Sequence, residues 1–406
     1  MASAAPTILQ IIPRLDTGGA ELMTIEITDA IVRGGGIALV ATEGGRMAER
    51  IGKAGGTLIP LSASSKSPIR MLANAAALVR LARDRHVGLI HARSRAPAWS
   101  AIIAARHAGL PFVTTYHGAY AERGPLKRLY NSVMARGDVV IANSAFTAEL
   151  IKRRYGTPSG RLRVIHRGID ARQFDGANIP AGRLAELRRS WGVGEHTRVV
   201  LQAARLTGWK GQGVVVAAAD LLRRDRRVGD WTVILAGDAQ GRTGYTEALR
   251  QDIGQRGLER LVRIVGHVDD MPAAFAAAHV AVVASIEPEG FGRTATEAQA
   301  MGCPVIATDI GAPRETVLAT PHAPACEATG WLVPPGDARS LADGLAQALT
   351  MTPAARGAMG ERARRHVTER FALSAMKRAT LEVYDELLGS KMASRLEPLR
   401  SASGPR

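Results

Sequence analysis

The sequence contains only two cysteines, Cys303 and Cys326, and neither belongs to a CxxC pair. Two isolated cysteines exclude a disulfide framework, so we expect a protein of the reducing cytoplasm. No run of about 18 apolar residues occurs, which argues against a membrane-spanning helix. The apolar run 8–12 is short and lacks the basic residues that open a secretory signal. Aromatic residues make up only 4% of the chain, and no recognised RNA- or DNA-binding motif is present.

Acidic residues are scarce in the first half of the chain. Residues 1–185 contain 25 lysines and arginines against 12 acids, whereas residues 186–388 contain 24 of each. Residues 389–406 contain four bases and one acid, and the formal charge of the whole chain is +16. Because such a field attracts anionic surfaces, we expect the first half to contact a membrane surface, a phosphorylated glycolipid or nucleic acid.

Short apolar runs alternate with helical stretches along the whole chain, which predicts an α/β protein. The polar stretch 171–183 is interpreted as a linker between two Rossmann-like parallel-sheet domains that face a cleft. The strands expected before the linker are 7–13, 36–42, 56–61, 87–91, 111–116, 138–142 and 163–166. Those expected after it are 198–203, 231–237, 261–265, 280–284, 304–308 and 330–333.

The most informative stretch is the turn after the strand 280–284, which carries Glu289. Ligands bind at the carboxyl ends of strands in open α/β sheets. Gly290 and Gly292 let a ligand approach the backbone, and the amino terminus of the following helix favours an anion such as a diphosphate. The carboxylates of Glu289 and Glu297 can accept hydrogen bonds from neighbouring hydroxyls of a sugar or ribose. A solvated turn with two surface acids is the alternative interpretation.

Three other segments follow predicted strands. Gly18 and Gly19 form a glycine-rich turn before a helix, a weak signal because tight turns often use glycine. Arg205 and Lys210 lie five positions apart on a loop, where they either bind an anion or form an exposed basic turn. His117 follows the strand 111–116, and most single histidines have a structural role.

The Glu-x7-Glu string at 289–297 and the Arg-x4-Lys loop at 205–210 resemble the retaining GT-B glycosyltransferases of family 4 (group 1). The resemblance covers nearly the whole chain and is strongest to bacterial lipopolysaccharide-core glycosyltransferases, including mannosyltransferases. It implies transfer of a sugar from a UDP- or GDP-linked donor to an acceptor hydroxyl. The chain departs from the family's Pro-Asn-Gly-Ile-Asp turn at His166 and Arg167.

The resemblance also implies a division of labour along the chain. Residues 1–183 would bind the acceptor, residues 184–370 would bind the nucleotide sugar, and the helix 371–388 would cross back to the first domain. We expect residues 389–406 to be a basic, disordered tail. No cofactor is expected, and the absence of an Asp-x-Asp motif argues against a metal site.

The expected catalytic residues are His117, close to the donor sugar, and Glu289, which would position the anomeric carbon. The residues expected to bind the donor are Gly18, Gly19, Arg205, Lys210, Glu289, Gly290, Phe291, Gly292, Arg293 and Glu297.

The acceptor residues are inferred from charge. Arginines at strand ends can bind phosphate or carboxylate with two hydrogen bonds. The expected acceptor residues are His91, Arg93, Arg95, Arg123, Lys127 and Arg128. The helix 67–85 is predicted to be amphipathic, with arginines along one side and an apolar side formed by Leu72, Ala76, Val79 and Leu81. It is either an ordinary solvated helix over a core or one that lies on anionic headgroups.

We therefore expect an anionic glycolipid acceptor, no nucleic acid partner, and peripheral association with the inner membrane from the cytoplasm. A nucleotide-sugar epimerase of the same fold and a nucleic-acid-binding protein are the alternative functions.

Overall fold

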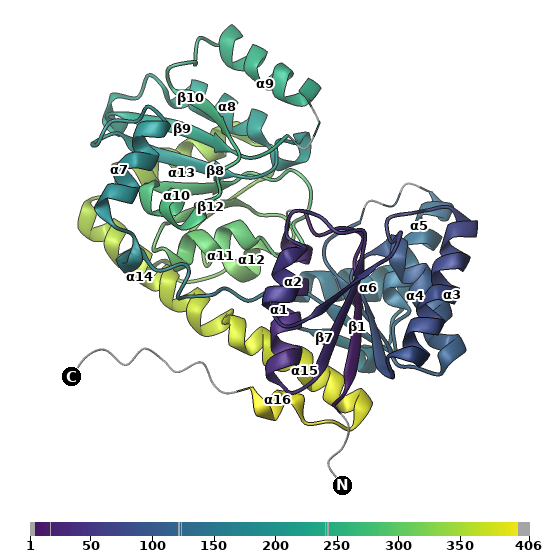
Figure 1. Ribbon diagram of the computed structural model, residues 1–406. Coiled ribbons are helices and arrows are strands. Elements are labelled where there is room, and N and C mark those ends of the chain that lie inside the picture. Colours follow the sequence, from purple (N-terminus) through teal and green to yellow (C-terminus); the bar gives the residue numbers. More distant parts are fainter. Residues whose placement is uncertain are drawn as a thin grey trace, which may run out of the picture. The chain divides into compact units, whose positions relative to one another are not determined.

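The computed structural model describes residues 5–16, 18–120, 122, 124–239, 241 and 243–396. Contacts divide the chain into two compact units (Figure 1), unit 1 (Met1–Gly168 and Leu373–Arg406) and unit 2 (Ile169–Ala372). The division at 168/169 lies before the expected linker. Residues from Ile169 onward join unit 2 because Ile169 N donates to Phe371 O at 2.8 Å and Phe174 is buried in the core of unit 2.

Unit 1 contains a seven-stranded parallel sheet in the order β3-β2-β1-β4-β5-β6-β7. Its central strands are buried along their whole length, since helices cover both faces of the sheet. The strands are β1 (Thr7–Ile11), β2 (Ile37–Thr42), β3 (Thr57–Pro60), β4 (Val87–Ala92), β5 (Phe112–Tyr116), β6 (Val139–Ala142) and β7 (Leu162–Val164).

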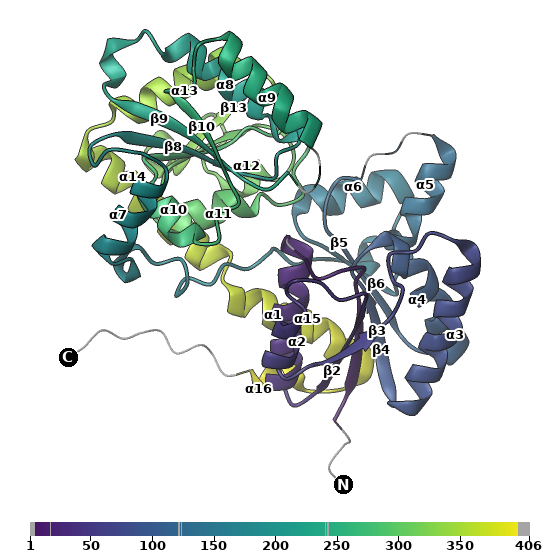
Figure 2. The same cartoon turned by 45° about the horizontal axis from the view of Figure 1, so that its top comes forward.

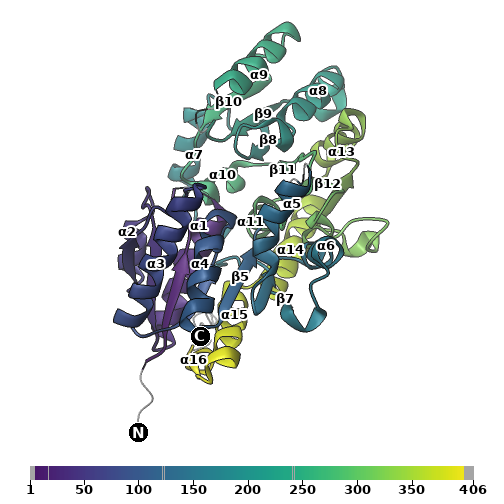
Figure 3. The same cartoon turned by 90° about the vertical axis from the view of Figure 1, so that its right-hand side faces the viewer.

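The two larger hydrophobic cores of unit 1 pack helices against this sheet. One core contains α3 (Pro68–Asp84) and α4 (Arg95–Ala108), which lie side by side in Figure 3. The other contains α1 (Gly19–Arg33) and α15 (Leu373–Leu388). The remaining helices of unit 1 are α2 (Glu49–Lys53), α5 (Pro125–Ser132), η1 (Val133–Ala135), α6 (Ala145–Tyr155), η2 (Ser159–Arg161) and α16 (Met392–Arg395).

The helix α16 lies inside the stretch that we expected to be disordered. Met392, Ala393 and Leu396 are buried in the same core as α1 and α15. These apolar residues order the start of the tail, a contact with sequence-distant elements that its basic composition did not reveal. Residues 397–406 of the expected tail lie outside the described residues.

Unit 2 contains a six-stranded parallel sheet in the order β10-β9-β8-β11-β12-β13. The order reverses between β8 and β11, which makes that position the topological switch point of the sheet. The strands are β8 (Arg198–Ala203), β9 (Trp231–Ala236), β10 (Val262–Gly266), β11 (Val280–Val283), β12 (Val305–Thr308) and β13 (Gly330–Val333).

Helices cover both faces of the sheet in unit 2 as well. Figure 2 shows α8 (Gln212–Leu222), α9 (Thr243–Gln255) and α13 (Ala338–Thr350) on one side of the sheet. The second core contains α10 (Met271–Ala277) and α11 (Arg293–Ala300). The other helices are η3 (Gly176–Asn178), α7 (Ala181–Ser190), η4 (Gly208–Lys210), η5 (Arg226–Val228), α12 (Pro313–Thr316), η6 (Ala325–Glu327) and α14 (Pro353–Arg370).

All thirteen expected strands occur in the structure, with bounds that differ by up to two residues. Within the described residues, no helix combines the length and the apolar character needed to cross a bilayer.

Candidate functional site

The loops that follow β8 and β11 meet at the switch point of unit 2, where close backbone packing holds them. A Cβ atom on Gly211 would lie 1.9 Å from the carbonyl oxygen of Ala284, the residue after β11. Gly211 also has a φ of 72°, a conformation that favours glycine. Gly311 supports the Glu289 loop in the same way, since its Cβ would lie 2.5 Å from Glu289 O. Glycine at these two positions therefore brings the charged loops together.

Glu289 and Lys210 form an ion pair at this point. One carboxylate oxygen of Glu289 accepts hydrogen bonds from Lys210 Nζ and, at 2.5 Å, from Ser285 Oγ. The Lys210 and Glu289 side chains are only 16% and 12% exposed. The Lys210 ammonium also lies 4.2 Å from the centre of the Trp209 ring. The structure thus brings together two of the expected donor residues from loops 79 positions apart.

The helix α11 carries the second acid of the motif, Glu297. Arg293 Nε donates to Glu297 Oε1 at 2.5 Å, an i,i+4 pair on a helix whose N-cap is Gly292 in the left-handed conformation. Phe291 is buried and packs edge-to-face against Phe371, with ring centres 5.3 Å apart. Phe291 therefore anchors the loop to the hydrophobic core of unit 2. Gly290, the residue before it, is also buried.

Arg205 follows β8 and is exposed, so its guanidinium is accessible to an anion. The main chain around it is fixed, because Gln212 Nε2 donates to Arg205 O at 2.9 Å. Gly237 permits close packing here, since its Cβ would lie 1.8 Å from Ala204 O. An exposed cation on a fixed main chain is suited to an anion such as a diphosphate.

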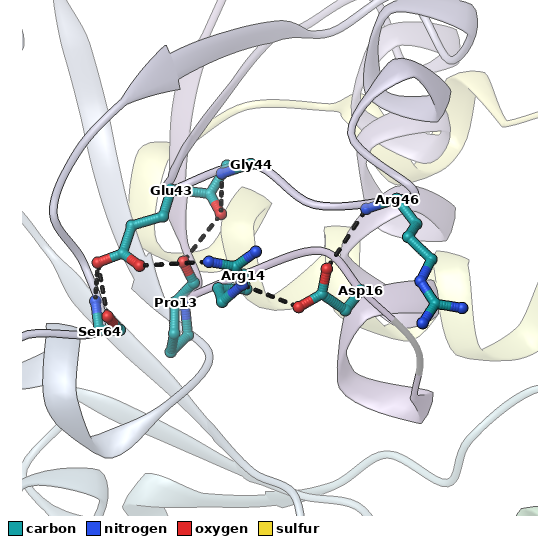
Figure 4. A network of polar contacts seen from close by, with 8 residues as sticks. Pro13, Arg14, Asp16, Glu43, Gly44, Arg46 and Ser64 are labelled. Carbon is teal, nitrogen blue, oxygen red and sulfur yellow. Dashed lines mark hydrogen bonds and ion pairs between the residues drawn. The ribbon is translucent and has the colours of Figure 1, made fainter. Parts of the chain in front are cut away.

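In unit 1, the loop after β1 that leads to Gly18 is held by the ion-pair network of Figure 4. Arg14 Nε donates to Asp16 Oδ2 at 2.8 Å, and this hydrogen bond lowers the pKa of Asp16 below its usual value. Arg14 Nη1 also lies 3.9 Å from Glu43 Oε2, and Ser64 donates to Glu43 from its backbone nitrogen and its hydroxyl. Loops after three neighbouring strands are thereby tied together.

Gly19 and His117 come together in unit 1, with Arg167 between them. A Cβ atom on Gly19 would lie 1.7 Å from Arg167 Nη1. Arg167 Nη2 donates to His117 Nδ1 at 3.0 Å, and Asn143 Nδ2 donates to His117 O at 3.1 Å. Burial and the nearby Arg167 and Arg93 charges hold the pKa of His117 well below its usual value, so its ring is neutral near pH 7.

His91 and Arg93 lie inside the unit and do not form an exposed acceptor site. His91 is fully buried, and its ring nitrogens pair with Tyr384 Oη at 2.6 Å and Thr115 Oγ1 at 2.8 Å. Arg93 is 1% exposed and donates to Gln10 Oε1 from Nε and Nη2. Because β4 is central in a sheet covered on both faces, the side chains at its end are buried. His91 is therefore not accessible to an acceptor.

Three other expected acceptor residues, Arg95, Lys127 and Arg128, lie on or beside α5. Arg95 Nη1 donates to Asn131 Oδ1 at 2.8 Å, and its guanidinium lies 4.1 Å from the centre of the Tyr120 ring. Lys127 and Arg128 are exposed on α5. Arg123 lies outside the described residues.

An apolar groove opens beside these bases and was not expected from the sequence. It has a volume of about 600 Å³ and is lined by Lys66, Met71, Trp99, Leu126, Lys127, Leu129 and Tyr130. Ile69, Leu72, Leu126 and Leu129 on α3 and α5 are 53–82% exposed. Leu72, which we had placed on an apolar side of helix 67–85, is thus at the surface, whereas Ala75, Leu78 and Ala82 face the core. Exposed apolar clusters of this kind mark contact surfaces.

Three residues of these sites were missed in the sequence. Ser285 supports Glu289 from the same loop, Gly311 supports it from the loop after β12, and Arg167 contacts His117 over 50 positions. Of the three, only Arg167 stood out in the sequence, because it departs from the family's Pro-Asn-Gly-Ile-Asp turn. That departure did not predict a role for it.

Two family models match the chain: Glycosyltransferase Family 4 over residues 17–173 and Glycosyl transferases group 1 over residues 185–366. A D-inositol 3-phosphate glycosyltransferase of Kineococcus radiotolerans is 31% identical over 77% of this chain and 74% of its own length. The lipopolysaccharide core biosynthesis mannosyltransferase LpsB of Rhizobium meliloti is 29% identical over 63% of this chain and 68% of its own. Three further D-inositol 3-phosphate glycosyltransferases are matched over 57–61% of their length.

Solved structures agree with these matches. A glycosyltransferase of Rickettsia africae has a TM-score of 0.85 and 32% identity, covering 95% of this chain and 99% of its own. Anabaena HepE in complex with UDP and glucose has a TM-score of 0.81 and 25% identity, covering 94% and 100%. The chain therefore belongs to the group 1 glycosyltransferases of family 4, and its two parallel-sheet units are those of the GT-B fold.

Proposed function

We propose that the protein moves a sugar, with retention of anomeric configuration, from a nucleoside diphosphate sugar to a hydroxyl of an anionic glycolipid, the lipopolysaccharide core. The observation that carries this proposal is the Lys210–Glu289 pair beside the glycine turn at the switch point of unit 2. A cation and a carboxylate held together there match a ligand that combines a diphosphate with sugar hydroxyls. The HepE complexes with UDP and UDP-glucose support a nucleotide sugar as donor.

Cleavage of the anomeric bond places negative charge on the diphosphate and positive charge on the sugar ring. Arg205, Lys210 and the amino terminus of α11 are suited to stabilise the negative charge. The acceptor oxygen bonds to the anomeric carbon as the bond to the diphosphate breaks, and the departing phosphate oxygen takes the acceptor proton on the same face. In this scheme Glu289 binds sugar hydroxyls and Glu297 the ribose.

Unit 1 also contains residues that we propose to bind the donor. The turn Gly18–Gly19 at the amino terminus of α1 is suited to the diphosphate, because helix amino termini favour anions. His117 is proposed to contact the sugar. Its neutral ring suits a hydrogen bond to an uncharged hydroxyl.

The acceptor proposal rests on charge and on the apolar groove. Residues 1–185 carry an excess of 13 positive charges, and both D-inositol 3-phosphate and lipopolysaccharide core are anionic acceptor types. If the acceptor were a soluble sugar phosphate, the exposed leucines beside the groove would have no apolar partner. The groove between α3 and α5 therefore favours a lipid-linked acceptor and a protein held at the cytoplasmic face of the inner membrane.

The donor reaction is tested with purified protein and a panel of UDP- and GDP-sugars. We expect one of them to be consumed slowly without acceptor and rapidly with it, and NMR of the product to show the anomeric configuration of the donor. An inverted product refutes retention. Interconversion of the nucleotide sugars without acceptor indicates the alternative epimerase.

The acceptor is tested by competition between purified lipopolysaccharide core and D-inositol 3-phosphate. We expect sugar transfer to the core lipid, with little transfer to the soluble phosphate. The reverse preference would assign the protein to the activity that its Kineococcus relative is named for.

A further inference from the structure

Buried donors without acceptors gather at the carboxyl edge of the sheet in unit 1. The Arg93 side chain is only 1% exposed, and its Nη1 has no hydrogen-bond partner among the described residues. His117 Nε2 is also buried, and no acceptor for it exists in the part of the chain that the structure describes. Such groups cost free energy unless a partner satisfies them, so their presence points to a ligand.

Arg167 determines which ring nitrogen of His117 carries the proton. Its Nη2 lies 3.0 Å from His117 Nδ1. A guanidinium can only donate hydrogen bonds, so Nδ1 is the acceptor. In the neutral ring the proton is therefore on Nε2, the atom that lacks a partner within the described residues.

The His117 backbone is fixed as well, because Asn143 Nδ2 donates to its carbonyl oxygen at 3.1 Å. Gly19 leaves room for the guanidinium, since any side chain there would begin 1.7 Å from Arg167 Nη1. The three residues Gly19, His117 and Arg167 thus form one cluster within unit 1, and each comes from a different loop.

We propose that Arg167 is a positioning residue that holds His117 in its Nε2–H tautomer, so that Nε2–H donates to an oxygen of the nucleotide-sugar donor. The oxygen belongs to a hydroxyl of the sugar, which can accept this hydrogen bond. The inference rests on the proposed function for the ligand, whereas the tautomer is a property of the free protein. Arg167 occupies the position where the related pattern has asparagine.

The tautomer is measured without substrate by correlating the ring protons and ring nitrogens of ¹⁵N-labelled histidine by NMR. The chain has 10 histidines, and the spectrum of His117→Gln identifies the signal by its loss. We expect a protonated Nε2 and an unprotonated Nδ1 in the wild type. A protonated Nδ1 overturns the proposal.

Two variants separate the hydrogen bond from the charge. Arg167→Met removes both, so we expect mixed tautomers and a His117 that titrates at higher pH. Arg167→Gln keeps an amide donor and should retain the Nε2–H tautomer. Arg163→Met is the control, because Arg163 pairs with Glu386 and does not contact His117. An unchanged His117 signal in Arg167→Met refutes the proposed role.

Activity then tests the consequence of the tautomer. We expect Arg167→Met to lower kcat about 10- to 100-fold, as loss of an orienting partner does at other sites, with a smaller effect in Arg167→Gln. Equal kcat in wild type and Arg167→Met contradicts a positioning role. If the wild type consumes no nucleotide sugar while the tautomer is as expected, the proposed function fails and the tautomer assignment stands.

Discussion

At the switch point of unit 2, two donors share one carboxylate oxygen of Glu289. Glu289 accepts hydrogen bonds from Lys210 and Ser285, and both charged side chains are largely buried. Because each charge is desolvated, each depends on the other, and removal of one leaves the second without its partner. The pair therefore links the stability of unit 2 to the proposed donor chemistry.

Substitution of this pair should separate stability from activity. Lys210→Met and Glu289→Gln should each lower kcat about 100- to 1,000-fold, as loss of a charge-stabilising group does in other enzymes. Each should also lower the free energy of unfolding by about 1–3 kcal/mol, since one partner stays unpaired. Steady-state kinetics and chemical denaturation measure the two effects.

The double variant Lys210→Met/Glu289→Gln provides the internal control. Its free energy of unfolding should return toward the wild-type value, while its activity should stay low. Arg223→Met, which removes a surface pair with Asp220, should leave activity unchanged. Near-normal turnover of both single variants at saturating substrate would remove Glu289 and Lys210 from the mechanism.

The sequence predicts residues well where spacing along the chain determines their position. Glu289 and Glu297 lie on one strand–turn–helix segment, so their location follows from the pattern. The role of His91 did not follow, because its partner Tyr384 is 293 positions away. Arg93 was also expected at an open edge, but its partner Gln10 lies on the neighbouring strand, 83 positions earlier. Contacts at such separations are set by packing, which the local pattern does not contain.

At the scale of elements, Gly211 controls how closely the turn before α8 approaches the end of β11. Gly211→Ala should destabilise unit 2 by more than about 2 kcal/mol, since a left-handed alanine costs about 1–2 kcal/mol before any overlap with Ala284 O. It should also lower kcat, because Lys210 would move with the turn. Gly213→Ala is the matched control, as no atom lies within 4 Å of its Cβ position. Equal stability of the two variants, measured by thermal unfolding, contradicts the packing argument.

The contact between β4 and α15 should make unit 1 sensitive to acid. Burial, followed by the charges of Arg93 and His117, lowers the pKa of His91 well below its usual value. The unfolded chain binds this proton near pH 6.5, so stability is full above that pH and falls as the pH drops toward the folded value. The slope should be about 1.4 kcal/mol per pH unit for one histidine.

Denaturation of wild type and His91→Asn between about pH 7 and pH 5 tests this slope. The variant should be less stable at neutral pH and should depend less on pH. Tyr384→Phe should lose about 1–3 kcal/mol at neutral pH, because His91 Nδ1 would lose its partner. Parallel pH curves for wild type and His91→Asn would show that His91 does not take up the proton.

Elements were predicted more completely than sites because parallel strands buried on both faces have a strong local signal. The run 280–283 is apolar at every position, and the glycine-rich turn that carries Glu289 comes soon after it in the sequence. The helix α16 was missed, since four residues have no periodicity and their order depends on burial against α1 and α15. The exposed face of α3 was also assigned incorrectly, because an apolar residue such as Leu72 does not by itself indicate which side meets the core.

At the scale of the whole molecule, positive charge and exposed apolar surface occur together in unit 1. Between residues 50 and 137 the only acids are Asp84 and Glu122, against fourteen lysines and arginines. The apolar groove lies in the same part of the chain, lined by Lys66 and Lys127 as well as leucines. An anionic bilayer satisfies both features, through its headgroups and its acyl chains.

Binding to vesicles of phosphatidylglycerol and phosphatidylethanolamine tests this combination. Leu126, at 82% exposed, should enter the acyl region, where burial of a leucine contributes about 1.5–3 kcal/mol. Leu126→Asp should therefore weaken sedimentation with vesicles by about tenfold or more. High salt should weaken binding of the wild type as well, because it screens the headgroup attraction.

Leu221→Asp is the matched control, since Leu221 is 50% exposed on α8 of unit 2 and lies outside the groove. Because both leucines are at the surface, neither change should affect folding by more than about 0.5 kcal/mol, so a difference in binding reports contact with the membrane. Salt and Leu126→Asp act on separate contributions and should together abolish binding. Equal binding of both variants, or equal binding to vesicles of neutral phosphatidylcholine, would show that the groove serves another partner, such as a protein.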